Sequence, residues 1–99
     1  MTVEITDTGS AVHVLLPAHL SAEDAAAMRS RLLEHGNRGG RNFYFQGSER
    51  FVIDTLFLGI LATLMRRCHA SISVSGLSSE ALQTCKKARM DKLIHLVKP

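Results

Sequence analysis

Apolar and polar residues alternate near the start of the chain, in residues 2–7 and again in residues 11–16. Successive side chains of a strand point to opposite faces, so a period of two is typical of a strand with one buried face. Gly9 and Ser10 lie between the two stretches and suit a tight turn. The pattern therefore predicts an opening β-hairpin. Its expected inward positions are Val3, Ile5, Val12, Val14 and Leu16.

Three later segments repeat apolar residues every three or four positions, which predicts amphipathic helices. The first begins at Ser21 and ends at Gly36, the second follows Asp54-Thr55, and the third runs from Ser78 to about Arg89. Ser and Asp are preferred before a first helical turn because their side-chain oxygens accept hydrogen bonds from its free N–H groups. The expected inward residues are Ala25, Met28, Leu32, Phe57, Ile60, Leu61, Leu64, Met65, Cys68, Leu82 and Cys85, with Leu33 as a further candidate on the first helix.

Short apolar or aromatic runs between these helices predict further strands at residues 42–45, 70–74 and 94–97. A helix between two strands is the connection that joins parallel neighbours in a sheet. The expected fold class is therefore α/β, with a mixed, largely parallel sheet of about five strands covered by about three to four helices.

Length and hydropathy narrow the class of protein. Ninety-nine residues suit a single domain over residues 1–99, and an apolar share of 45% indicates a folded chain rather than a disordered one. The most apolar stretch, Phe51 to Met65, is shorter than the roughly 20 residues that span a bilayer and contains Asp54. We therefore expect a core segment there and no membrane insertion. The first residues do not resemble a signal peptide, so we expect a cytoplasmic location.

The residue types that usually carry chemistry are scattered. The five histidines have no metal-binding spacing, Cys68 and Cys85 form no C-x-x-C motif, and no G-x-S-x-G turn is present. We therefore expect no metal, no cofactor and no catalytic residue, hence a protein that is not an enzyme. The net charge is +3, and much of the basic excess lies late in the chain. Without aromatic platforms or a nucleic-acid motif, we interpret that excess as a solvated helix face and expect no nucleic-acid partner.

The strand-to-helix junction at Asp54-Thr55 is the most informative position. A hydroxyl at a helix N-terminus is exposed at the end of the sheet, and a phosphate placed there would add about two negative charges beside free N–H groups. The alternative is that Asp54 or Thr55 only caps the helix and contributes about 1 kcal/mol. The local pattern leaves both interpretations open.

Residues 51–61, FVIDTLFLGIL, resemble the signature of the STAS family (sulfate transporter and anti-sigma factor antagonist), which runs F-I-D-S-S-G-L-G-V-L. The opening hairpin, Leu20-Ser21, the turn at Gly76 and residues 90–93 follow in family order. The resemblance implies a STAS-like fold and a non-enzymatic, protein-binding regulator. It also implies that Thr55 occupies the position of the hydroxyl that a partner kinase phosphorylates in anti-sigma factor antagonists.

The chain departs from the family pattern at three positions. Leu56 and Phe57 stand where the family often has Ser and Gly, and Gln46 replaces a frequent Asp. These changes put the phosphorylation of Thr55 in question and predict a more apolar exposed rim, which is typical of a protein interface. The predicted partner-binding surface consists of Gln46, Ser48, Asp54, Thr55, Leu56, Phe57 and Leu58.

Two functions therefore remain as alternatives. The first is a partner-switching regulator that binds a serine/threonine kinase anti-sigma factor and responds to phosphorylation of Thr55. The second is an accessory STAS subunit of a bacterial ABC-type lipid transporter, which would bind the ATPase without phosphorylation. Small subunits of that kind resemble this chain in carrying Asp-Thr at the junction. The oligomeric state is left open, with a homodimer among the alternatives.

Overall fold

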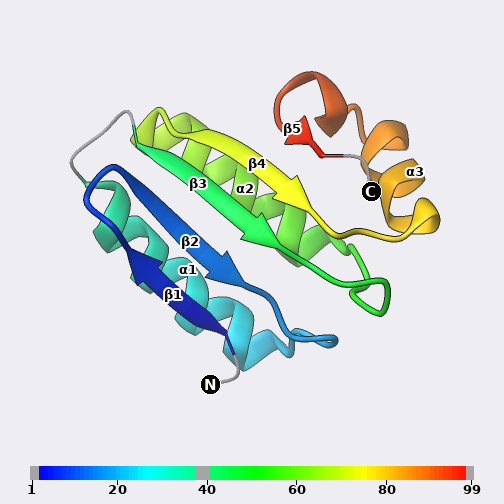
Figure 1. Ribbon diagram of the computed structural model, residues 1–99, viewed down its shortest axis with the longest axis horizontal. Helices are drawn as coiled ribbons and strands as arrows, with labels where there is room; N and C mark the ends of the chain where they lie inside the picture. Colours follow the sequence, from blue (N-terminus) through cyan, green and yellow to red (C-terminus); the bar gives the residue numbers. More distant parts are fainter. Residues whose placement is uncertain (1–2, 38–40, 98–99) are drawn as a thin grey trace.

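A computed structural model describes residues 3–37 and 41–97 of the chain (Figure 1). Its elements are β1 (Glu4–Asp7), β2 (Ala11–Leu15), α1 (Ala22–Gly36), β3 (Asn42–Gln46), α2 (Thr55–Cys68), β4 (Ser71–Ser75), α3 (Ser79–Lys87), the 3-10 helix η1 (Met90–Lys92) and β5 (His95–Leu96). The predicted strands and helices are present in the predicted order. Residue 2 of the first predicted strand lies outside the described residues, and so do residues 38–40, whose glycines predict a loop, and Lys98, one of the basic residues late in the chain.

The five strands form one mixed sheet in the order β1-β2-β3-β4-β5. β1 pairs with β2 in antiparallel fashion, whereas β2, β3, β4 and β5 are parallel neighbours. In the centre of the sheet, Phe45 of β3 lies between Val14 of β2 and Val74 of β4. The structure thus confirms the α/β fold class with a mostly parallel sheet and three α-helices.

The strand order explains why the helices gather on one side. From β2 to β5 each new strand joins the same edge of the sheet, and crossover connections between parallel strands are right-handed in nearly all proteins. A right-handed connection that always advances in one direction puts every helix on the same face. In Figure 1, α1 and α2 lie behind the strands, and no described helix passes in front of them.

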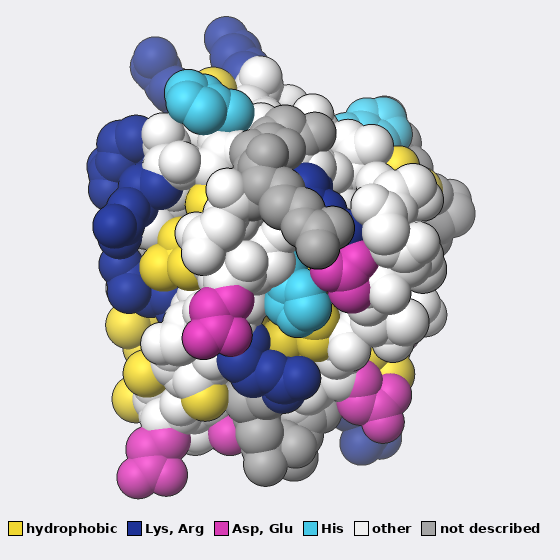
Figure 2. All heavy atoms as spheres, turned by 90° about the vertical axis from the view of Figure 1, so that its left-hand side faces the viewer, with side chains coloured by type: hydrophobic (Ala, Val, Ile, Leu, Met, Phe, Trp, Pro, Cys, Tyr) yellow, Lys and Arg dark blue, Asp and Glu magenta, His cyan; other side chains and the backbone are white. Residues whose placement is uncertain are grey.

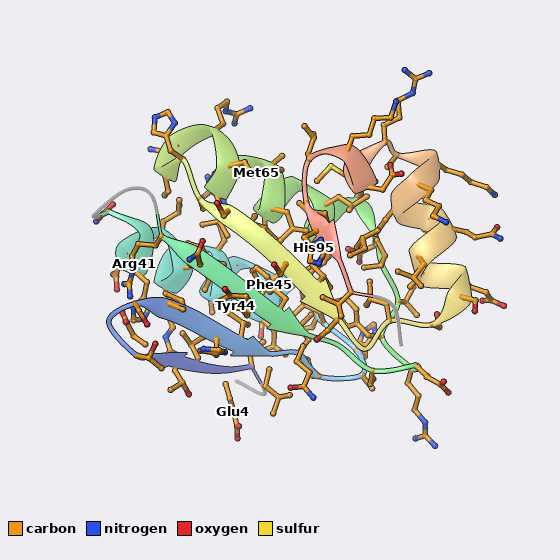
Figure 3. The ribbon with its side chains drawn as sticks, turned by 45° about the horizontal axis from the view of Figure 1, so that its top comes forward. Glu4, Arg41, Tyr44, Phe45, Met65 and His95 are labelled. Atoms are coloured by element: carbon orange, nitrogen blue, oxygen red, sulfur yellow. The ribbon has the colours of Figure 1, made fainter. Side chains whose placement is uncertain are left out.

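The opposite face of the sheet is open. In β3 the side chains of Phe43 and Phe45 are buried under the helices, whereas Tyr44 is 42% exposed. The ring of Tyr44 stacks on His13 of β2 with centroids 5.2 Å apart. Figure 3 labels Tyr44 and His95 on strands of the sheet and Met65 on α2 in the helix layer. An uncovered face is unusual for a parallel sheet, because such sheets normally have both faces covered.

The apolar side chains between the sheet and the helices form one contiguous core. The predicted inward residues of α1 and α2 are buried, except that Met65 and the further candidate Leu33 are partly buried and pack against the core. Cys68 and Cys85 are both buried and unpaired, as expected for cysteines on apolar helical faces. Leu82 of α3 is partly buried and packs against the same core.

One helix end differs from the prediction. The third helix was expected to reach about Arg89, but α3 ends at Lys87. Arg89 has a φ of 60°, in the left-handed region, and the chain turns there into η1. The first helix ends at Gly36, as predicted. A Cβ at Gly36 would lie 2.7 Å from the Cys68 Sγ, so the glycine also allows α1 and α2 to approach closely.

None of the helices in residues 3–37 and 41–97 combines the length and the apolarity needed to cross a lipid bilayer.

Candidate functional site

The segment from Gly47 to Asp54 links β3 to α2 and is anchored by alternate residues. Phe51 and Ile53 are buried, whereas Val52 between them is 70% exposed. The N–H of Phe51 donates to the carbonyl of Ser48 at 3.1 Å, which closes a turn in the same segment. The start of α2 is therefore held in place by core packing on its N-terminal side.

The backbone at the ends of the parallel strands packs closely beside this segment. The Gly47 N–H donates to the Ser75 carbonyl at 2.8 Å, and the Gln46 carbonyl accepts from the Leu16 N–H at 2.9 Å. Gly76 has a φ of 74°, and a Cβ there would lie 2.8 Å from the Gly47 carbonyl oxygen. Only glycine fits this conformation and this approach, so the predicted turn at Gly76 is confirmed.

Asp54 is the N-cap of α2. Its backbone is extended, and its Oδ1 accepts a hydrogen bond from the Phe57 N–H at 2.9 Å. The capping role considered for this junction therefore belongs to Asp54. Thr55 is the first residue of the helix and is exposed, and its hydroxyl has no hydrogen-bond partner within residues 3–37 and 41–97. Beyond the Asp54 cap the first turn carries no acidic residue, so a negative charge at Thr55 would meet the positive end of the helix dipole, although it would also lie next to the Asp54 carboxylate.

Thr55 and Leu56 lie at one end of an open groove of about 370 Å³ between α1 and α2. Small and apolar side chains provide most of its surface. The lining residues are Ala22, Ala25, Ala26, Arg29, Thr55, Leu56, Gly59, Ile60 and Thr63. Leu56 is 51% exposed. The Thr63 hydroxyl donates to the Gly59 carbonyl at 2.8 Å, so this polar group is already satisfied within α2.

The predicted site residues divide among several environments. Asp54, Thr55 and Leu56 are exposed together at the start of α2, and Ser48 is exposed in the preceding segment. Leu58 is partly buried and packs against the core. Of the exposed apolar surface expected beside Thr55, the structure shows Leu56, whereas the exposed side chain of Val52 lines a different hollow beside α3.

Phe57 does not belong to that surface. Its side chain is only 1% exposed, and its ring packs edge to face on Phe45 at 5.7 Å and on Phe51 at 5.1 Å. The expectation that Phe57 adds bulk to an exposed rim is wrong, because the helix turns this side chain into the core. Phe57 supports the site from beneath and cannot touch a partner directly.

Gln46 lies on a different surface from Thr55. It follows Tyr44 on the open face of β3 and lines a shallow hollow there of about 220 Å³ with His13, Tyr44 and residues of β1. Thr55 and Leu56 line the groove on the helix side of the sheet. A contact surface that includes both Gln46 and Thr55 would have to wrap around the end of the sheet.

A second polar cluster lies at the other end of the parallel strands, where β3 begins. The Arg41 guanidinium donates to both Asp7 carboxylate oxygens and to the carbonyls of His35 and Gly9. His35 Nδ1 lies 2.9 Å from Asp7 Oδ2. This histidine therefore has a polar partner, although the histidines are scattered along the sequence. Hydrogen bonding, first from Arg41, holds the pKa of Asp7 well below its usual range.

This cluster connects the opening hairpin, the end of α1 and the start of β3. Figure 2 views this end of the molecule and shows acidic, basic and histidine side chains close together near its middle. Sequence reasoning missed the cluster because Asp7 is separated from His35 by 28 positions and from Arg41 by 34. Both Asp7 carboxylate oxygens, both terminal nitrogens of Arg41 and His35 Nδ1 are used in binding the chain to itself, so we assign the cluster a structural role.

The geometry offers no obvious cofactor or metal site within the described part of the chain. No group of three or more His, Cys, Asp and Glu residues there is arranged to hold a metal ion. Ligands of open α/β sheets usually bind where the strand order reverses, and the order of these five strands does not reverse. The groove beside Thr55 is therefore the leading candidate for a functional surface. A scan against protein-family models and a search of the curated proteins found no match to this chain.

Proposed function

We propose that this chain is a non-enzymatic, protein-binding regulator of the STAS type, similar to an anti-sigma factor antagonist. One observation carries the proposal. An exposed hydroxyl without a hydrogen-bond partner among the described residues, that of Thr55, lies at the start of α2 beside an open, largely apolar groove. Apolar surface with a polar edge favours binding of another protein. We place this activity in the cytoplasm, where a kinase partner would act.

Phosphorylation of Thr55 would switch this surface without unfolding the helix. A phosphate adds about −1.5 to −2 charge at neutral pH, and at a helix N-terminus that charge is favourable for the helix itself. The same charge would lie beside Leu56, within the surface that a partner covers. We therefore expect the phosphorylated form to fold normally and to bind its partner more weakly.

The alternative function is that of an accessory subunit that binds a transporter ATPase without phosphorylation. It is favoured by the Asp54-Thr55 pair and by the apolar side chain at Leu56, which suits a permanent contact better than a charged switch. In this case the Thr55 hydroxyl would contact the partner directly. Removal of the hydroxyl would then weaken the complex, whereas in a phosphorylation switch it would keep the complex formed.

The two functions are distinguished by titrating the isolated partner with the wild type, Thr55→Ala and Thr55→Glu in a calorimeter. Thr55→Glu should weaken binding in both cases, and Thr55→Ala should weaken it only in the second. Mass spectrometry of the complex incubated with ATP reports directly on phosphorylation of Thr55. Ser79→Glu is a matched control, because Ser79 is also the exposed first residue of a helix that follows a capping residue. Equal affinity of all four proteins would refute the proposed site.

A further inference from the structure

The groove beside Thr55 extends along both helices. α1 and α2 each follow one strand of a parallel pair and precede the next, so they run in the same direction across the sheet. The groove of about 370 Å³ lies over their N-terminal halves. A second hollow of about 220 Å³ lies over their C-terminal ends and is lined by Leu33, Gly36, Asn37, Arg67 and Cys68. The two hollows are separate and share no lining residue, but they follow one another along the same helix pair, and we call them together the α1–α2 furrow.

The floor of this furrow is suited to close approach by a backbone. Ala22 and Ala26 of α1 face Gly59 of α2 across the groove, and a Cβ placed on Gly59 would meet no atom within 4 Å. Side chains of two neighbouring helices form ridges and grooves into which a third helix packs. At about 1.5 Å per residue, a helix of about 14 residues would cover the length of α2.

The charges along the furrow indicate what kind of helix fits. Arg29 lines the first hollow and Arg67 the second, and both are exposed. Neither has an ion-pair partner among residues 3–37 and 41–97, where the ion pairs are those of Asp7 with His35 and Arg41. Along its left-hand edge, on the side of the helix layer, Figure 2 shows Lys and Arg side chains beside hydrophobic ones. Unpaired arginines next to an apolar floor favour a partner with carboxylates.

We propose that the α1–α2 furrow receives an amphipathic helix of the partner protein. Small and apolar side chains of that helix pack over Ala26 and Gly59, and its acidic side chains pair with Arg29 and Arg67. This inference rests on the proposed function and identifies the partner element that the surface recognises. It also gives a reason for the effect of a phosphate on Thr55, because new negative charge at one end of the furrow repels an acidic helix.

A defined peptide tests the inference without knowledge of the partner. The probe is an 18-residue synthetic helix with Ala and Leu along one face and Glu on both flanks, and its counterpart carries Lys in place of Glu. Each peptide is titrated into the isotope-labelled full chain, and amide shifts are followed by NMR. We expect saturable shifts at the residues lining the furrow with the Glu peptide, and at least tenfold weaker binding of the Lys peptide. Absence of saturable shifts, equal binding of both peptides, or shifts on the open sheet face instead would overturn the inference.

Neighbouring alanines of α1 provide a matched pair of variants. Ala26 lines the groove and Ala27 does not, yet both are exposed positions of the same helix. Ala26→Leu should weaken the Glu peptide about tenfold or more, whereas Ala27→Leu should change its affinity less than about twofold. Gly59→Leu fills the same groove from α2, at a position where a Cβ would meet no other atom within 4 Å, and should weaken the Glu peptide in the same way. Arg29→Glu should reverse the preference between the two peptides, and an unchanged preference would contradict the assigned role of Arg29.

Failure of this inference and failure of the proposed function give different results. If the peptides do not bind but Thr55→Glu still releases the natural partner, the helix inference is wrong and the regulatory function stands. If the Glu peptide binds in the furrow while all Thr55 variants hold the natural partner equally, the furrow is a helix-binding site and the role of Thr55 is refuted.

Discussion

Replacement of Phe57 by alanine is the most direct test of how α2 is oriented. The Phe57 ring is 1% exposed and packs edge to face on both Phe45 and Phe51. Truncation of a buried Phe costs about 3–5 kcal/mol because transfer energy is lost and a cavity remains. Each aromatic pair contributes about 0.5–1.5 kcal/mol beyond the buried area, so we expect the upper half of that range. Against a total stability of about 5–15 kcal/mol, the loss is large.

Urea unfolding followed by circular dichroism gives the free energy of unfolding and its slope for each variant. Leu56→Ala is the matched control, because Leu56 is the adjacent residue and is 51% exposed. An exposed position of this kind should change the stability by no more than about 0.5 kcal/mol. The reverse result would refute the reasoning. A cost below about 1 kcal/mol at Phe57 together with a large cost at Leu56 would mean that the helix is rotated by one residue and that Phe57 faces the partner.

Three further predictions concern the end of α1, the ion pair of Asp7 and the buried thiol of Cys85. Gly36→Ala should destabilise the chain by about 1–3 kcal/mol despite the better helix propensity of Ala, because its Cβ would lie 2.7 Å from the Cys68 Sγ; the loss should shrink in a Cys68→Ala background. Asp7→Asn should lower the urea midpoint at pH 7. The pKa of Asp7 is lowered in the fold, so its stabilisation is fully present above the ordinary value of about 3.9 and is lost as the pH falls toward the lowered pKa of the folded state. The difference between wild type and variant should therefore begin to shrink below about pH 4, and a constant difference would contradict this. Burial raises the pKa of the Cys85 thiol and shields it from solvent, so we expect Cys85 to react with a thiol reagent only after unfolding. Rapid labelling of the native chain would show that this side of the core is open.

Features set by neighbouring residues could be predicted from the sequence. Ser21 and Ser78 were predicted as helix caps, and Asp54 was one of two candidates for the second helix; each of the three accepts a hydrogen bond from the N–H three residues further on. Gly9 and Gly76 were assigned to turns, and both have positive φ values. These features depend on interactions within about four residues, so the local pattern contains the information needed.

The candidate site was predicted only in part. The exposure of Thr55 and Leu56 at the start of α2 agrees with the prediction, whereas the exposure expected of Phe57 does not. Spacing placed Phe57 on the apolar face of its helix, but the family resemblance placed it on the binding surface, and the helical periodicity gave the correct result. A residue three positions after a cap can face either the core or a partner, and the packing of Phe45 and Phe51 decides which.

The sequence by itself determined the order of the elements, their caps and turns, and the largely parallel character of the sheet, because these follow from short-range periodicity and from the helices that join the strands. Only the tertiary structure decided that α1 and α2 cover the same face of the sheet, that Arg29 and Gly59 border one groove, and that Asp7 meets Arg41. The physical reason is that periodicity shows which residues share a face of one element but not which distant element covers that face. That choice depends on the strand order and on close packing between segments that lie far apart in the chain.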